Sequence, residues 1–98
     1  MEELDEPLSQ KAAVKLTLEI VLSGNVTYSK HALKEMEEDN IEVLDVRNVL
    51  RAGIMSKAAE WENESWRYRM TTAKFAVVFV FRSKAEIKVV TAWRFKKR

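Results

Sequence analysis

Hydrophobic residues recur at helical spacing through the first part of the chain. Between positions 10 and 23 they form two neighbouring rows, Ala13, Leu16 and Ile20 in one and Val14, Leu18 and Val21 in the other. Such rows are typical of an α-helix with one buried face. Ser9 stands where a helix N-cap is expected, and Gly24 stands where the helix should stop. The pattern therefore predicts a helix over residues 10–23.

Two further helices are predicted by the same pattern. Ser29 can cap a helix over 30–39, and Asn40, which tolerates a left-handed backbone, can end it. A third helix is expected over 42–52, with Gly53 as its stop. The inward positions are Ala32, Leu33 and Met36 in the earlier helix, and Val43, Val46, Val49 and Leu50 in the later one. The segment 25–28 between the first two helices is too short to be more than an edge segment.

After Gly53 the hydrophobic period becomes that of a strand. Residues 66–72 alternate polar and apolar side chains, residues 74–81 are apolar on both faces, and residues 86–95 alternate again. In the last of these, Ile87, Val89, Thr91, Trp93 and Phe95 are expected on one face, and Lys88, Val90, Ala92, Arg94 and Lys96 on the other. Residues 54–62 are a weaker strand, and residues 82–85 connect a hairpin.

The order of these elements predicts an α+β fold. Four sequential strands with short connections usually form an antiparallel meander, and residues 74–81 should be its centre. The three N-terminal helices are the available cover for the apolar face of this four-stranded antiparallel sheet. Residues 1–8 are expected to be a flexible acidic tail, and residues 9–98 to form one domain.

Composition excludes several classes of function. The chain has no cysteine, so disulfide frameworks, thiol catalysis and cysteine zinc sites are excluded. It has one histidine, and its two glycines are isolated, so neither a dense histidine metal site nor a glycine-rich phosphate loop is expected. No cofactor is expected. No stretch approaches the roughly 18 apolar residues of a membrane span, and the acidic start is unlike a secretory signal. We therefore expect a cytoplasmic protein without a membrane partner.

Charge is distributed unevenly along the chain. Residues 1–50 hold 5 Lys or Arg and 11 Asp or Glu, a balance of −6, whereas residues 51–98 hold 12 and 4, a balance of +8. The basic half is a candidate surface for a polyanion. The alternative is that acidic helices pack against a basic sheet within one molecule.

The candidate chemistry lies on the predicted sheet. Its cations are Arg67, Arg69, Lys88, Arg94 and Lys96, interleaved with Trp66, Tyr68 and Trp93. Fixed cations can bind phosphates and stabilise charge that develops during cleavage, and aromatic faces can stack unpaired bases. The alternative is that the aromatics belong to the core and that the cations only solvate the outer face. His31, alone in the first turn of its helix, is more often structural than catalytic.

Several short motifs resemble a family of small toxin-like domains allied to BrnT and the RelE superfamily. Residues 28–36 resemble the opening "S-x-H-A-x-x-R/E-M", and the helix at 41–50 resembles "I-x-x-x-x-V-x-x-V-L". Residues 66–69 and 89–93 resemble the family's "R-Y-R/x-V" and "I-V-T-V-x" strands. The element order is also similar to that of MqsR, a RelE-fold ribonuclease. The resemblance spans about residues 16–95 and implies a RelE-like fold.

The resemblance implies a metal-independent endoribonuclease in which a 2′-hydroxyl attacks the phosphate. By position, Lys57 and Lys96 are similar to strand lysines of MqsR, whereas Arg67 stands where MqsR-like proteins carry a glutamine. We expect Lys57, Arg67, Arg69 and Lys96 to contact phosphate or stabilise charge, Tyr68 to transfer a proton or stack, and His31 to be a further catalytic candidate. The expected RNA-binding residues are Lys88, Trp93, Arg94, Lys97 and Arg98.

Two functions remain open at this point. The first is an mRNA interferase that acts as the toxin of a toxin–antitoxin pair, with RNA as its substrate and an acidic antitoxin as its protein partner. The second is a non-catalytic domain on the same fold that binds RNA or protein through the same basic face.

Overall fold

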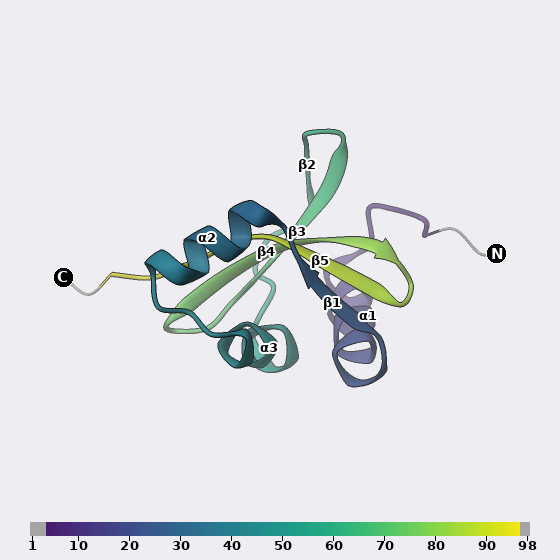
Figure 1. Ribbon diagram of the computed structural model, residues 1–98. Helices are drawn as coiled ribbons and strands as arrows, with labels where there is room; N and C mark the ends of the chain where they lie inside the picture. Colours follow the sequence, from purple (N-terminus) through teal and green to yellow (C-terminus); the bar gives the residue numbers. More distant parts are fainter. Residues whose placement is uncertain (1–3, 97–98) are drawn as a thin grey trace.

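The computed structural model describes residues 4–96, which form three helices and one five-stranded sheet (Figure 1). The elements are α1 (Gln10–Ser23), β1 (Asn25–Tyr28), α2 (Lys30–Glu38), α3 (Val43–Ala52), β2 (Glu60–Glu62), β3 (Ser65–Thr71), β4 (Phe75–Ser83) and β5 (Glu86–Arg94). The protein is therefore an α+β fold with most of its helices before most of its strands, as the sequence predicts.

The helices begin where their capping residues stand. The hydroxyl oxygen of Ser9 accepts a hydrogen bond from the backbone N–H of Ala12 at 3.1 Å, and that of Ser29 accepts one from Ala32 at 3.0 Å. At the start of α3 the N–H of Glu42 donates to the Asp45 carboxylate at 2.9 Å, as part of a capping box. All three predicted helices are confirmed, the second ending one residue earlier and the third beginning one residue later than expected.

The sheet differs from the predicted four-stranded antiparallel meander. Its order is β1-β5-β4-β3-β2, with β4 at the centre as expected and antiparallel pairing from β2 through β5. The segment 25–28 forms a fifth strand, and it runs parallel to β5. Its backbone bonds join residues some 60 positions apart, such as the N–H of Asn25 to the carbonyl of Ala85 at 2.9 Å. No local pattern encodes such a pairing, so the sequence did not reveal it.

The strand expected over 54–62 is also shorter than predicted. Only Glu60–Glu62 forms a strand, whereas Ile54 makes an isolated bridge with Thr71. The bridge holds the chain just after α3 against the end of β3.

Helices α1 and α3 cover one face of the sheet (Figure 1). Helices α1 and α3 pack against each other beneath the sheet, and α2 lies along β5 beyond the end of β1. The expectation that all three helices cover the apolar face is therefore correct for two of them. No helix formed by residues 4–96 covers the opposite face, which we call the open face.

The core lies between the sheet and helices α1 and α3. The apolar side chains that β3, β4 and β5 send into it are Tyr68, Met70, Phe75, Val77, Phe79, Phe81, Ile87, Val89 and Ala92. Full burial of one large apolar side chain stabilises a fold by roughly 1.5–3 kcal/mol. On α1 the buried face is rotated from the predicted rows, because Thr17 is buried and Leu18 is 38% exposed. The Thr17 hydroxyl donates to the Ala13 carbonyl at 2.7 Å, which allows its burial.

A β-bulge overturns the predicted alternation of the last strand. Val78 pairs with Thr91 but Phe79 pairs with Val89, so Val90 is an extra residue in β5. Beyond the bulge Ala92, expected beside the cations, enters the core, and Trp93 turns to the open face.

The same bulge sends Arg94 to the helix side of the sheet. Its guanidinium lies 4.7 Å from the centre of the Phe75 ring and donates to the backbone carbonyls of Asp39 and Asn40. The expectation that Arg94 shares a polar face with Lys88 is therefore wrong.

The described part of the expected acidic tail contacts the domain. Leu4 and Leu8 pack against the core, and the N–H of Leu8 donates to the Tyr68 hydroxyl at 3.0 Å. The same hydroxyl donates to the Glu6 carboxylate at 2.9 Å. Residues 4–8 are thus tied to β3.

Gly53 is predicted to be intolerant of a side chain. A Cβ at this position would lie 2.5 Å from the Val49 carbonyl oxygen and 2.8 Å from that of Thr71. The Val49 oxygen accepts the N–H of Gly53 at the end of α3, and the Thr71 oxygen accepts the N–H of Ile54 in the Ile54–Thr71 bridge. Neither oxygen can therefore move away easily. We expect Gly53→Ala to lower the free energy of unfolding by about 1–3 kcal/mol in urea titrations. The exposed neighbour change Ser56→Ala should stay within about 0.5 kcal/mol. An unchanged urea midpoint for Gly53→Ala would contradict the close contact between a Cβ at this position and the two carbonyl oxygens.

Tyr68→Phe tests the anchoring of the N-terminal segment. The change removes both hydrogen bonds of a buried hydroxyl, so stability at neutral pH should fall by about 1 kcal/mol. Tyr28→Phe is the matched control, because the Tyr28 hydroxyl is buried and has no hydrogen-bond partner in the described part of the chain, so its loss should cost nothing.

The same variant should alter the stability at alkaline pH. Burial raises the pKa of Tyr68 from its ordinary value of 10.0 to about 12. Between these values the unfolded chain releases the proton and the folded chain retains it, so the free energy of unfolding should fall as pH rises from 10 to 12. Tyr68→Phe should show a smaller fall over that interval, and an identical pH profile would contradict the assignment.

Candidate functional site

Cationic and small apolar side chains form rows across the open face. The pairing register aligns Arg69 of β3 with Val78 of β4, and Val78 with Thr91 of β5. In the next row Val80 pairs with Lys88. Neighbouring strands stand about 4.8 Å apart, so each row is a narrow apolar floor flanked by polar side chains.

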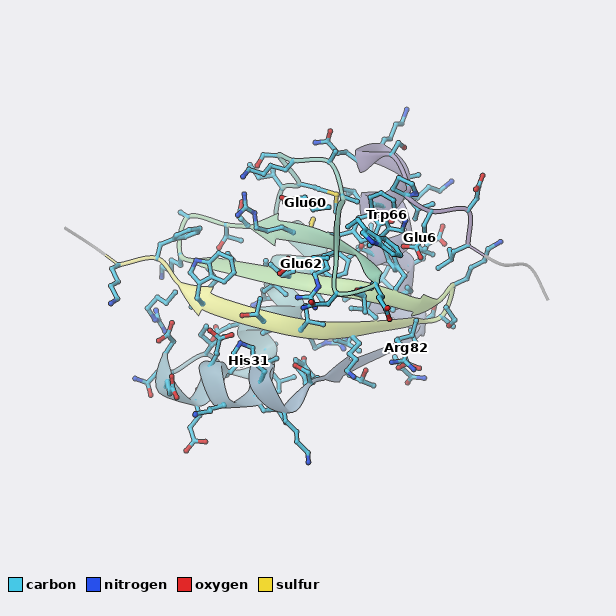
Figure 2. The ribbon with its side chains drawn as sticks, turned by 90° about the horizontal axis from the view of Figure 1, so that it is seen from above. Glu6, His31, Glu60, Glu62, Trp66 and Arg82 are labelled. Carbon is cyan, nitrogen blue, oxygen red and sulfur yellow. The ribbon has the colours of Figure 1, made fainter. Side chains whose placement is uncertain are left out.

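The first half of β3 leaves the sheet. Strand β3 pairs with β4 only from Tyr68 to Thr71, whereas its residues Ser65–Arg67 pair with β2. The hairpin of β2 and β3 therefore rises from the open face, as Figure 1 shows. Glu60 and Glu62 belong to this hairpin, and Figure 2 shows both on the side of the sheet that carries no helix. This departure creates two recesses at the foot of the hairpin.

The first recess gathers the predicted cations, and we call it the basic recess. It has a volume of about 160 Å³ and is lined by Lys57, Ala58, Glu60, Glu62, Arg67, Tyr68, Arg69 and Val78. Lys57 comes from the turn before β2, and both arginines stand two residues apart on β3. Three of the residues expected to contact phosphate therefore lie together.

The cations of the basic recess have few partners. The Nε atom of Arg67 is buried and has no hydrogen-bond partner among the residues that the structure describes. Within residues 4–96, Lys57, Arg67 and Arg69 form no ion pair closer than 4.0 Å with a carboxylate. A buried N–H donor without an acceptor is unfavourable unless a ligand supplies one. The recess is therefore suited to a small anionic group such as a phosphate.

Glu60 and Glu62 were not predicted as site residues. Each stands opposite a residue of β3 in the hairpin, Glu60 opposite Arg67 and Glu62 opposite Ser65. Alternation within the segment 54–62 could have placed both carboxylates on one face. Their proximity to Arg67, however, depends on the hairpin register, which was not predicted.

His31 lies away from the basic recess, where α2 meets β5. Its side chain is 69% exposed, and its Nε2 atom lies 2.8 Å from the Glu35 carboxylate. The Thr91 hydroxyl donates to the same carboxylate oxygen. Thr91 shares a row with Arg69, two strands or about 10 Å away, and His31 lies on α2, next to the Thr91 side of this row.

The remaining predicted residues have different positions. The Tyr68 ring is buried in the core, stacked on Phe79, and its hydroxyl is fully bonded. Lys88 and Trp93 lie on the open face, and Arg94 lies on the other side. Lys96 is exposed beyond the end of β5. Lys97 and Arg98 lie outside the described residues.

The described residues, 4–96, contain neither a cluster of metal ligands nor a helix that could span a membrane. This part of the chain has no group of three or more His, Asp or Glu side chains arranged to hold a metal ion. None of its helices is long and apolar enough to cross a membrane.

Comparison with known proteins identifies a family. The model of DUF4258, described as a domain of unknown function, matches residues 28–94, which include every element from α2 to β5. No curated protein and no solved structure matches the chain. The matched region contains the whole basic recess and excludes α1. Because the match covers well over half of the sequence, this chain belongs to the DUF4258 family.

Proposed function

We propose that this protein is a metal-independent endoribonuclease with a RelE-like fold, which acts in the cytoplasm as the toxin of a toxin–antitoxin pair. One observation carries the proposal: Arg67 presents a buried, unpartnered Nε in a recess that also holds Lys57 and Arg69. Three cations without carboxylate partners at one small cavity suit a phosphodiester better than an apolar ligand.

The recess contains the groups that cleavage requires. A carboxylate, Glu60 or Glu62, takes the proton from the 2′-hydroxyl, whose oxygen then bonds to the neighbouring phosphorus. The bond between phosphorus and the 5′ oxygen breaks, and that oxygen takes a proton from the Lys57 ammonium. Arg67 and Arg69 stabilise the charge on the phosphate oxygens. The products are a 2′,3′-cyclic phosphate and a 5′-hydroxyl.

The open face offers a path for a single strand. Lys88 and Trp93 lie on it beside the basic recess, and Trp61 of the hairpin is 60% exposed. Exposed aromatic faces stack unpaired bases and cations follow the backbone. The resemblance to RelE-type toxins supports an acidic antitoxin as the partner that covers this face, through complementary charge.

Substitutions in the basic recess should separate catalysis from binding. We expect Arg67→Ala to lower the single-turnover rate of RNA cleavage by about 10²–10³. Glu60→Gln and Glu62→Gln, tested separately, should identify the general base. The variant that lacks the base should cleave about 10²–10⁴ times more slowly while retaining RNA affinity. All assays contain EDTA, which removes divalent metal ions. The control variant is Lys11→Ala, which removes a cation of α1 that does not line the basic recess.

Two results would contradict the proposal, the first its nuclease activity and the second its mechanism. The first is RNA binding without any cleavage by the folded parent protein, with affinity reduced in Arg67→Ala, which would establish the non-catalytic binding domain. The second is cleavage at a nucleotide whose 2′-hydroxyl has been replaced by hydrogen, which would exclude the proposed attack.

Expression in a bacterial host tests the role as a toxin. We expect induction of the parent protein to arrest growth with loss of mRNA, and expect Arg67→Ala to relieve the arrest while Lys11→Ala does not. Co-expression of an acidic protein encoded beside this chain should restore growth. Harmless accumulation of the folded parent protein would count against the role.

A further inference from the structure

The second recess lies in the wedge between the hairpin and the β4–β5 end of the sheet, and we call it the aromatic recess. It has a volume of about 410 Å³, and its lining includes Trp61, Trp66, Glu6, Glu64, Arg82 and Lys88. Figure 2 shows Trp66 and Glu6 together at this end of the molecule, with Arg82 nearby. The proposed cleavage mechanism uses none of these side chains.

Two tryptophans give the aromatic recess its stacking surface. Trp61 and Trp66 stand opposite each other in the hairpin, with ring centres 5.3 Å apart and planes at 64°. Trp66 packs against the core, whereas Trp61 is 60% exposed. One ring is therefore held in place and the other has a free face, an arrangement suited to a flat aromatic ligand.

The aromatic recess has two kinds of charged side chain, carboxylates that accept hydrogen bonds and cations. One oxygen of Glu6 accepts the Tyr68 hydroxyl, and its other oxygen has no hydrogen-bond partner within residues 4–96. The Glu64 carboxylate makes no hydrogen bond there either. The carboxylates favour a ring edge with adjacent N–H donors. Lys88 and Arg82 add positive charge for a phosphate.

The two recesses are neighbours. Val78 lines the basic recess and Val80 the aromatic one, and residues two apart on one strand face lie about 7 Å apart. Trp66 and Arg67 are consecutive residues that line one recess each. A base in the aromatic recess can therefore belong to a nucleotide whose phosphate reaches the basic recess.

We propose that the aromatic recess binds the guanine base of an RNA nucleotide beside the scissile phosphate. Guanine presents two adjacent N–H donors, N1–H and N2–H, along its pairing edge, which match a carboxylate acceptor, and its ring system stacks on tryptophan. The proposal rests on the proposed function for the position of the phosphate, and it names the base next to which cleavage occurs. Adenine, cytosine and uracil each lack this pair of adjacent donors.

Direct binding tests the aromatic recess without requiring cleavage. Tryptophan fluorescence of the full chain is titrated with GMP, AMP, CMP and UMP, and we expect GMP to bind most tightly. Trp61→Ala should weaken GMP binding roughly 5- to 150-fold, as loss of base stacking does. Trp61→Phe should restore most of the affinity. Leu22→Ala, which truncates a 70% exposed side chain of α1, is the control.

Glu64→Gln tests the recognition of guanine. It keeps the size of a hairpin side chain and replaces one acceptor oxygen by a donor, so it should reduce the preference for GMP over AMP about tenfold or more. Equal affinity for all four nucleotides in the folded parent protein would overturn guanine recognition, as would an unchanged preference in this variant.

The outcomes also distinguish this proposal from the nuclease itself. GMP preference without RNA cleavage would retain the base site and reject the nuclease. Cleavage that is unselective in sequence, and equally fast in Trp61→Ala, would retain the nuclease and reject the base site. If Trp61→Ala does not fold, Trp61→Phe and Glu64→Gln decide the matter in the same assays.

Discussion

The rest of the structure depends on the packing and hydrogen bonding of the buried Tyr68 side chain. Its ring packs between Phe79 and Phe81 in the core, with ring centres 5.9 and 4.8 Å away. Tyr68 is also the residue of β3 at which pairing with β4 begins, directly after the part of β3 that pairs with β2. Its hydroxyl meanwhile binds Glu6 and Leu8. One buried side chain therefore anchors the N-terminal segment and marks where the sheet opens. Both recesses lie next to this point, on either side of the departing strand.

Contacts within the molecule satisfy only some of the cations in the basic half of the chain. The Arg94 guanidinium donates to the backbone carbonyls of Asp39 and Asn40, and the Asp39 carboxylate accepts the backbone N–H of Arg94. Within residues 4–96, Lys57, Arg67 and Arg69 remain without carboxylate partners closer than 4.0 Å. Backbone carbonyls at the end of α2 thus satisfy the Arg94 guanidinium, whereas the cations of the basic recess can bind an external anion.

The expected active site and the proposed one share Lys57, Arg67 and Arg69 but not Lys96, and they differ in their proton-transfer groups. Tyr68 is buried with its hydroxyl bonded, and burial raises its pKa to about 12, so it is poorly suited to accept a proton at neutral pH. His31 is bonded to Glu35 on α2 and does not line the basic recess. The hairpin carboxylates Glu60 and Glu62 stand beside the arginines instead, so the proposed mechanism assigns them the role of base.

The sequence by itself determined the features that depend on near neighbours. Helix ends followed from Ser9, Ser29 and Gly53, because caps and stops act within one helical turn. The central strand followed from a run of residues that is apolar on both faces, and the common face of Arg67 and Arg69 followed from a period of two. The parallel fifth strand, the bulge in β5 and the meeting of Lys57, Glu60 and Glu62 with the arginines were decided only by tertiary structure. Each depends on backbone pairing between separate segments, and a single slip in register reverses the face of every side chain beyond it.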